Sequence, residues 1–222
     1  MQITAHDVRI LIADDHEIVR TGLKELLASR PGWLICAEAS TGRQAVILAN
    51  QHKPDILVMD IGLPELNGIE AARIVRKTLP RTEVLMFSLH YSEQLLREVI
   101  QAGVRAYVSK ADANRDLVLA VEALANHRSF FTSRTAELFI GRCSKRDCST
   151  ERHVLWVDPL TSREREVVQL VAEGKSAKEV AAMLGITVKT ADTHRANLMR
   201  KLDIHSISGL VRYAIRNQIV DL

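Results

Sequence analysis

The first 126 residues alternate between two patterns of hydrophobic and polar positions. Short runs that are apolar throughout are typical of strands buried on both faces of a sheet. These runs are Val8–Ala13, Leu34–Ala39, Ile56–Met59, Val84–Phe87 and Ala106–Val108. Apolar residues recur with helical spacing in Glu17–Ser29, Thr41–Gln51, Gly68–Thr78, Ser92–Gln101 and Arg115–Asn126. The strict alternation predicts an α/β fold: a doubly wound, parallel five-stranded sheet of flavodoxin-like order with helices on both faces.

The pattern changes after Asn126, where the predicted strands stop. Residues Ser133–Arg142 have a helical pattern, whereas residues 143–158 mix charged and polar residues without a period and resemble a linker. From Leu160 onward the whole chain has helical spacing. We therefore predict an α/β domain at 7–127, a linker with a helix at 128–158, and a small all-α domain at 159–222.

Composition places the chain among folded proteins. Of its 222 residues 47% are hydrophobic, and no run of about 18 apolar residues suggests a membrane span. The N-terminus lacks the basic and apolar regions of a signal peptide, so we expect a cytoplasmic protein. The net charge is +3, and residues 159–222 hold 10 basic against 7 acidic residues, which is compatible with nucleic-acid binding.

The three cysteines, Cys36, Cys143 and Cys148, form no regular framework. An odd number without a pattern indicates reduced thiols. A structural zinc site needs four ligands, and only His153 lies near Cys143 and Cys148. We expect no zinc there.

Acidic residues follow two of the predicted strands directly. Asp14 and Asp15 come after the first strand and Asp60 after the third. In a doubly wound sheet these strand ends are neighbours at the edge where ligands bind. Three adjacent carboxylates repel one another unless a cation lies among them, and Mg²⁺ prefers such oxygen ligands. The alternative for Asp14 and Asp15 alone is that they are solvated surface acids.

Two further residues end the fourth and fifth strands at the same edge. Ser88 closes the fourth strand and Lys110 follows the fifth. A lysine neutralises and a hydroxyl donates to a phosphoryl group, and a carboxylate can itself be the nucleophile that forms an aspartyl phosphate. The set predicts a phosphoryl site.

These residues resemble the receiver domain of two-component response regulators over about residues 7–127. The resemblance rests on Asp14–Asp15, the stretch Asp60 to Pro64 with Gly68 eight residues after the aspartate, Ser88, and Tyr107 to Lys110. It implies that Asp60 accepts phosphate from a histidine kinase. It implies that Asp15, Asp60 and the Gly62 carbonyl bind Mg²⁺ with help from Asp14, and that Ser88 and Lys110 hold the phosphoryl group.

A phosphatase of the haloacid-dehalogenase type is the enzymatic alternative, because it also uses a strand-end aspartate. That class has a second aspartate two residues later, where this chain has Gly62. The chain has no G-x-x-x-x-G-K-[ST] phosphate loop, so nothing in the sequence supports a kinase or nucleotidase activity. We therefore expect no enzymatic activity. The small Gly62, where bulkier residues are common in receivers, predicts a phosphoryl face open to water.

The C-terminal segment is marked by helix caps. Thr161 with Glu164 and Ser176 with Glu179 have the spacing of capping boxes. The turn from Gly185 to Thr187 then leads into a helix from about Val188 to Leu202. Two helices joined by such a tight turn predict a helix-turn-helix motif.

A helical wheel separates the faces of this last helix. Ala191, Leu198 and Leu202 share an apolar face. The residues predicted to contact DNA are Lys189, Thr190, Thr193, His194, Ala196, Asn197 and Arg200. Long donors and small residues are what a recognition helix needs in the major groove, although a solvated face is the alternative. Asp192 is unfavourable near phosphate, and the role of Arg195 is ambiguous.

From Leu160 to about Val220 the chain resembles LuxR-type DNA-binding domains, so the whole resembles the NarL/FixJ subfamily. That implies a third helix in the major groove and a fourth, Ser206–Asn217, that dimerises. Its apolar residues Ile207, Leu210, Val211, Ala214 and Ile215 also fit simple core packing. The implied partners are a sensor histidine kinase, double-stranded promoter DNA and, when active, a second copy; no membrane is expected.

Two functions fit this architecture: a transcription factor controlled by phosphorylation, and a receiver whose C-terminal domain binds proteins. The capped helix-turn-helix with Lys189 and Arg200 favours the first. For the switch, the resemblance implies that phosphorylation draws Ser88 inward and that Tyr107 fills the vacated space. We expect the receiver to pack against the DNA-binding domain and block it before phosphorylation.

Overall fold

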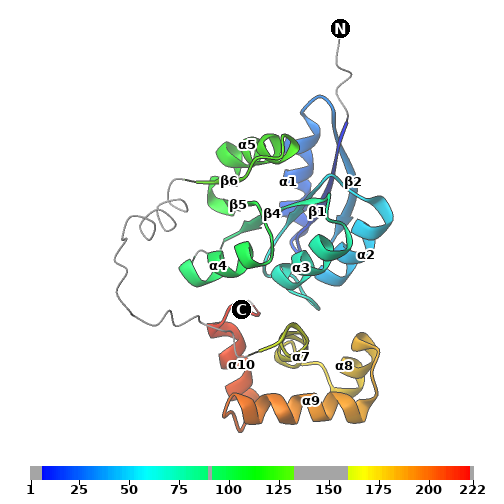
Figure 1. Ribbon diagram of the computed structural model, residues 1–222, viewed down its shortest axis with the longest axis vertical. Helices are drawn as coiled ribbons and strands as arrows, with labels where there is room; N and C mark the ends of the chain where they lie inside the picture. The colour runs from blue at the N-terminus through cyan, green and yellow to red at the C-terminus, as the bar shows by residue number, and fades with distance from the viewer. Residues whose placement is uncertain (1–6, 90–91, 133–159, 221–222) are drawn as a thin grey trace.

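The computed structural model describes residues 7–89, 92–132 and 160–220 (Figure 1). The helix predicted at Ser133–Arg142, the linker at 143–158, and Cys143, Cys148 and His153 lie outside these residues. The described chain forms an α/β domain and a helical domain, as the two patterns predict.

The first domain is built on a parallel sheet of order β2-β1-β3-β4-β5-β6. Its strands are β1 Val8–Ala13, β2 Trp33–Ala39, β3 Ile56–Met59, β4 Glu83–Ser88, β5 Ala106–Ser109 and β6 Phe130–Phe131. The predicted doubly wound order is confirmed, but the sheet has six strands and not five. The missed strand, β6, has two residues, too few for periodicity to detect, and it pairs with β5 through Tyr107 and Ala106.

Helices cover both faces of this sheet. They are α1 Glu17–Ala28, α2 Gly42–His52, α3 Gly68–Thr78, α4 Glu93–Gln101 and α5 Ala113–Ala125. Because side chains alternate along a strand, Leu11 of β1 packs with α2, α3 and α4 in one apolar cluster, and Ile10 packs with α1 and α5 in the other. Strands buried on both faces explain the continuous apolar runs in the sequence.

The chain approaches itself closely after β3. The Gly68 N–H donates to the Ile61 carbonyl at 2.9 Å, and a Cβ at position 68 would lie 2.0 Å from the Asp60 carbonyl oxygen. Only glycine fits, since real Cβ atoms do not come within 3.0 Å of another heavy atom. Gly68 thus lets α3 start directly beside Asp60.

The second domain contains α7 Ser162–Ala172, α8 Ala177–Leu184, α9 Val188–Lys201 and α10 Ile207–Arg216. Both predicted capping boxes are present, at Thr161 with Glu164 and at Ser176 with Glu179. Gly185 ends α8 in the left-handed conformation with φ of 64°. These helices share an apolar core of their own, so the domain has the internal packing to fold independently.

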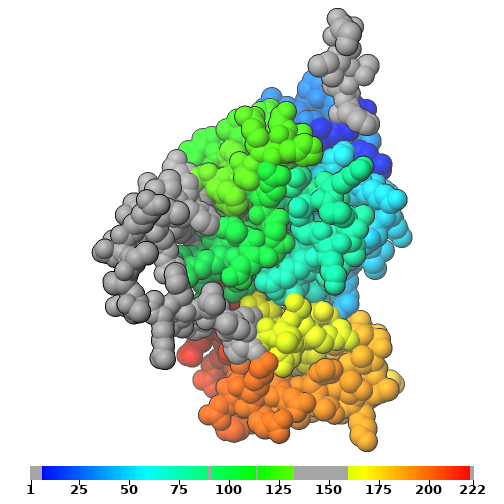
Figure 2. Space-filling model, viewed as in Figure 1, coloured from blue at the N-terminus to red at the C-terminus, as the bar shows by residue number. Residues whose placement is uncertain are grey.

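The two domains pack against each other. In Figure 1, α7 lies below the loop between β3 and α3 and near α4, whereas α9 lies on the side away from the sheet; Figure 2 shows the two surfaces in close contact at α7. Among the described helices, none is long and apolar enough to cross a membrane.

Candidate functional site

Three carboxylates meet at the carboxyl ends of β1 and β3. Asp14 and Asp60 are buried and Asp15 is exposed. The Asp60 N–H donates to the Ala13 carbonyl at 2.8 Å, which continues the pairing of the two strands and fixes both acids at one edge. Single ligand atoms of Asp14, Asp15, Asp60 and His16 all lie within 4.8 Å of one another. The strand-end reasoning is confirmed for these aspartates.

Lys110 joins the cluster from the end of β5. Its Nζ lies 2.6 Å from Asp60 Oδ2 and 2.7 Å from Asp14 Oδ2. The other Asp60 oxygen, Oδ1, accepts a hydrogen bond of 2.8 Å from the Ile61 N–H. The lysine therefore contacts one oxygen of the Asp60 carboxylate while the backbone holds the other.

Burial and charge act in opposite directions on these groups. Burial raises the pKa of Asp60 above its usual value, and the hydrogen bond from Lys110 only partly offsets this. Burial alone would lower the pKa of Lys110, but its hydrogen bonds to Asp14 and Asp60 raise it above the usual value. Lys110 is thus held in its charged form at neutral pH.

The residues present fit a magnesium ion. Three carboxylates against the Lys110 ammonium leave an excess of two negative charges, which a divalent cation balances. The carboxylates supply hard oxygen ligands, as Mg²⁺ requires. Gly62, whose carbonyl the family resemblance implies as a ligand, lines the same pocket as Asp15 and Asp60.

His16 is a member of this cluster that sequence reasoning missed. Its imidazole Nδ1 lies 2.8 Å from Asp15 Oδ1, and its backbone N–H donates to Asp14 Oδ1 at 2.9 Å. Its position directly after two strand-end aspartates was the available signal. The side chain is exposed, so it lies at the rim of the pocket.

Ser88 and Tyr107 occupy the neighbouring strands. Ser88 is buried at the end of β4, in register with Ser109 of β5. Tyr107 is only 2% exposed and belongs to the apolar cluster of α3 and α4. The ring is therefore buried in this structure, and the coupled movement of Ser88 and Tyr107 on phosphorylation stays a prediction.

The predicted DNA-contacting residues lie on α9. Lys189, Thr190, Thr193, Ala196, Asn197 and Arg200 are exposed, and His194 is half-buried. Ala191 and Leu198 are buried in the domain core and the half-buried Leu202 packs against it, as the helical wheel predicts. Arg195 forms an ion pair of 3.2 Å with Asp192, which offsets the negative charge that this aspartate brings to the helix.

The fourth helix divides its apolar residues between two roles. Leu210 and Ala214 are fully buried in the core of the second domain, so the packing interpretation holds for them. Ile207 is 55% exposed, and Val211 and Ile215 are half-buried. These three leave a partly apolar outer face.

Comparisons with known proteins agree with both halves of this geometry. The family model for the response regulator receiver domain matches residues 10–122, and that for the luxR family of bacterial regulatory proteins matches residues 158–214. The transcriptional regulatory protein MctR of Rhizobium johnstonii is 35% identical over 96% of this chain and 95% of its own. This chain belongs to the LuxR family of two-component response regulators.

Other relatives of this response regulator support the assignment. The response regulator protein VraR of Staphylococcus aureus is 30% identical over 96% of this chain and 99% of its own. A LuxR-family regulator from Aurantimonas sp. SI85-9A1 is 35% identical over 61% of this chain and 96% of that structure, with a TM-score of 0.58. The RcsB–DNA complex, at 22% identity and a TM-score of 0.57 over 93% of this chain and 97% of that one, shares the fold.

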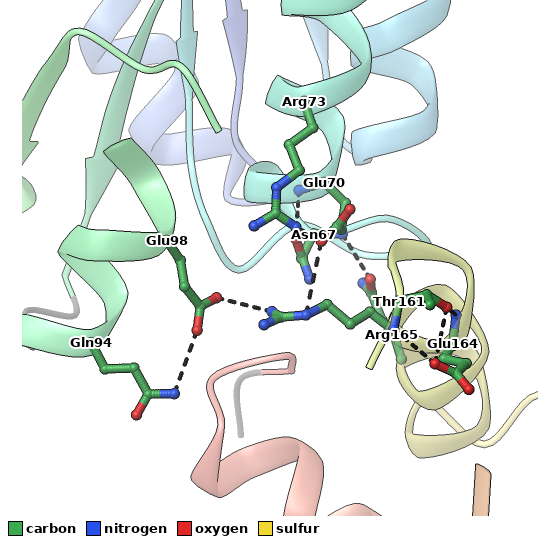
Figure 3. Close-up of polar contacts among 9 residues, drawn as sticks. Asn67, Glu70, Arg73, Gln94, Glu98, Thr161, Glu164 and Arg165 are labelled. Carbon is green, nitrogen blue, oxygen red and sulfur yellow. Dashed lines mark hydrogen bonds and ion pairs between the residues drawn. The ribbon is translucent and has the colours of Figure 1, made fainter. Parts of the chain in front are cut away.

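In this response regulator the receiver and the DNA-binding domain share a polar interface. Arg165 of α7 is 6% exposed and reaches Glu98 of α4 at 2.9 Å and Glu70 of α3 at 4.0 Å (Figure 3). Gln169 donates to the Leu63 carbonyl at 2.9 Å and accepts from the Asn67 N–H at 2.7 Å. The interface is thus specific and hydrogen-bonded.

The sequence led us to expect that the two domains pack together, but it did not identify the residues of the interface, although a signal existed. Arg165, Gln169 and Glu173 are spaced by four residues and therefore share one helical face. Two of them are buried despite being polar, which is uncommon unless a partner satisfies them. The partner is on the other domain, so the stripe alone could not identify it.

Proposed function

We propose that this response regulator is phosphorylated on Asp60 by a sensor histidine kinase and that the phosphorylated form binds promoter DNA as a dimer through α9. The observation that carries the proposal is the position of Lys110, whose ammonium contacts both Asp60 and Asp14 at adjoining strand ends. A buried carboxylate with one oxygen facing a lysine is arranged to receive an anionic group.

The proposed phosphoryl transfer from the kinase histidine to Asp60 needs few groups on this chain. An Asp60 carboxylate oxygen forms a bond to phosphorus while the bond from phosphorus to the kinase histidine nitrogen breaks, and the imidazole leaves with the electron pair. Lys110 and Ser88 hold the transferred oxygens, one by charge and one by hydrogen bonding. Asp14, Asp15, Asp60 and the Gly62 carbonyl would hold Mg²⁺, which when bound offsets the negative charge of the phosphoryl oxygens.

The DNA-binding part of the proposal rests on the exposed basic face of α9. Lys189 and Arg200 lie at opposite ends of this face and are both exposed. RcsB, which shares the fold, is described as bound to promoter DNA in the presence of the phosphomimetic BeF₃⁻. A LuxR-type domain that reads paired half-sites would bind as a dimer, for which the outer face of α10 at Ile207 is available. A regulator of this kind acts in the cytoplasm.

The test uses the intact chain with phosphoramidate and Mg²⁺. Intact-mass measurement should show one added phosphate, and Asp60→Asn should show none. Asp55→Asn, at the other end of β3, is the matched control and should react as the wild type does. Phosphorylation that persists in Asp60→Asn would exclude Asp60 as the acceptor.

Selection from a random DNA pool tests the second half. The phosphorylated chain should enrich a specific sequence with paired half-sites. Recovery of no sequence by either form would favour the alternative, a C-terminal domain that binds proteins.

A further inference from the structure

The pocket that contains Asp60 is walled by both domains. Asp15, Asp60, Gly62 and Pro64 line it from the receiver, and Gln169 and Glu173 line it from the DNA-binding domain. The cavity measures about 290 Å³. Gly62 contributes no side chain to this lining, whereas Gln169 and Glu173 at the end of α7 do, and these two form what we call the second wall.

Hydrogen bonds hold this second wall in place. The Gln169 amide bonds to the backbone of the loop between β3 and α3 at both Leu63 and Asn67, and it is 1% exposed. The Glu173 carboxylate accepts from the Glu65 N–H at 3.0 and 3.3 Å and from the Gln169 amide at 2.8 Å. All three receiver residues belong to the segment that directly follows Asp60.

The wall also brings a negative charge to the pocket. Glu173 is a carboxylate at a cavity that already contains Asp15 and Asp60. Phosphorylation replaces the single negative charge of the Asp60 carboxylate by about two on the acyl phosphate, a net gain of about one negative charge. Like charges in a partly enclosed pocket repel more strongly than they do in water. Phosphorylation therefore disfavours the docked position of Glu173.

We infer that Gln169 and Glu173 make docking of the DNA-binding domain and phosphorylation of Asp60 mutually unfavourable. The inference rests on the proposed role of Asp60 and adds to it that the DNA-binding domain is part of the phosphoacceptor pocket. Coupling of this kind is reciprocal. The phosphoryl group therefore favours release of the domain. Separately, the docked Gln169 and Glu173 line the pocket through which a phosphodonor must reach Asp60, so docking slows phosphoryl transfer.

The first experiment weakens the wall in the full-length chain. Gln169→Ala removes both hydrogen bonds to the loop backbone, and Gln51→Ala, at the exposed far end of α2, is the matched control. Phosphoramidate with Mg²⁺ is the donor: its P–N bond breaks, an Asp60 oxygen bonds to phosphorus, and ammonia leaves with the proton already on the donor nitrogen. We expect phosphorylation several-fold faster in Gln169→Ala than in the wild type or in Gln51→Ala.

The second experiment isolates the charge. The radius of gyration from small-angle scattering is measured with and without beryllofluoride and Mg²⁺, which mimic the phosphoryl group. We expect beryllofluoride to enlarge the wild type and Glu122→Gln, in which an exposed charge on α5 is lost. In Glu173→Gln the increase should be much smaller, because the repelling carboxylate is gone while an amide oxygen still accepts from Glu65.

The outcomes separate the two hypotheses. If no variant with Asp60 intact takes up phosphate, the proposed function fails. If Asp60 is phosphorylated but Gln169→Ala reacts at the wild-type rate, or Glu173→Gln expands as much as Glu122→Gln does, the inference of a shared pocket wall is overturned and the proposed function stands.

Discussion

The two faces of the DNA-binding domain differ in what they contact. The α7 face is buried against the receiver, where Arg165 and Gln169 are less than a tenth exposed. The α9 face, with Lys189 and Arg200, is exposed and lies on the side away from the sheet (Figure 1). Docking therefore buries one face of α7, close to Asp60. The described residues leave α9, the helix predicted to bind DNA, uncovered.

This difference refines how the receiver would restrain the domain. The expected packing of the two domains is present, but it does not cover α9. If the chain binds paired half-sites as a dimer, as proposed, docking would limit how freely the domain orients and pairs with a second copy. We therefore expect changes on the α9 face to alter DNA binding directly, and changes near the α7 face to alter the coupling between the two domains.

The largest effect is expected on the α9 face. Lys189→Ala and Arg200→Ala should each weaken DNA binding by about 1–3 kcal/mol if the side chain contacts a base edge. If they contact only phosphates, binding should fall on all sequences and depend less on salt. Binding to the selected sequence, measured over a range of salt concentrations, distinguishes the two cases.

The matched control for that pair removes two exposed charges from the receiver. Arg30→Ala with Lys77→Ala lowers the net charge equally but lies outside α9. This variant should keep most of the affinity. If the α9 double variant also binds as the wild type does, the reading face lies elsewhere.

A smaller effect is expected at the phosphoacceptor end. Asp15→Ala should weaken Mg²⁺ binding by about tenfold or more, because a carboxylate of the cluster is lost and the charge excess falls. Glu17→Ala removes an exposed charge two residues later, outside the cluster, and should leave the affinity nearly unchanged. Mg²⁺ titration followed by NMR measures both; equal affinities in Asp15→Ala and the wild type would place the ion elsewhere.

A third prediction asks whether the receiver limits the orientation of the DNA-binding domain or covers α9 itself. A chain that starts near Val154 should bind DNA without a phosphodonor, because α7 to α10 have their own core. On paired half-sites it should bind about fivefold or more tighter than the unphosphorylated full-length chain, and phosphorylation should give the full-length chain a similar gain. On a single half-site the two chains should bind alike, since α9 is exposed in both.

The opposite pattern would contradict this prediction. A truncated domain that also gains affinity on a single half-site would mean that the receiver covers α9 in solution. A truncated domain that gains nothing on either site, together with no effect of phosphodonor, would mean that the receiver does not restrain it.

The sequence predicts the phosphoacceptor end better than the domain interface. Strand ends in a parallel sheet converge by topology, so Asp14, Asp60 and Lys110 could be placed together from apolar runs alone. Capping boxes are local, so the starts of α7 and α8 followed from four residues each. The contacts of Gln169 and Glu173 join segments about a hundred residues apart through a linker, and no local pattern determines such a pairing.

Short and irregular features of the fold could not be predicted from the sequence for similar reasons. The strand β6 is held by pairing with β5 and not by its own periodicity. Glu65 adopts a left-handed φ of 67°, which its residue type does not predict. Its N–H is the one that meets Glu173, so the unexpected backbone conformation coincides with the unexpected interface.

The smallest effect concerns Glu164, which connects α7 with α9. Its carboxylate completes the capping box with Thr161 and accepts a hydrogen bond of 2.7 Å from Lys201 at the end of α9. Burial acts to raise the pKa of Glu164, but the bonds from Lys201 and Thr161 outweigh it and hold the pKa below the usual 4.5. A lowered pKa in the folded state means that the ionised form stabilises the fold. That contribution is complete above the pKa of the unfolded chain and is lost as the pH falls through the folded value. Glu164→Gln should therefore lower the free energy of unfolding of the second domain at pH 7 by about 1 kcal/mol or less, because solvent screens the pair. The difference from the wild type should shrink at acid pH.

Glu179→Gln alters the equivalent capping box on α8 and is the matched control, because the bonds of Glu179 to Ser176 involve no lysine of another helix. Urea unfolding of the domain that starts near Val154, at pH 7 and below pH 4, measures these differences, and a Glu164→Gln deficit that stays constant with pH would refute the ionic link between the two helices.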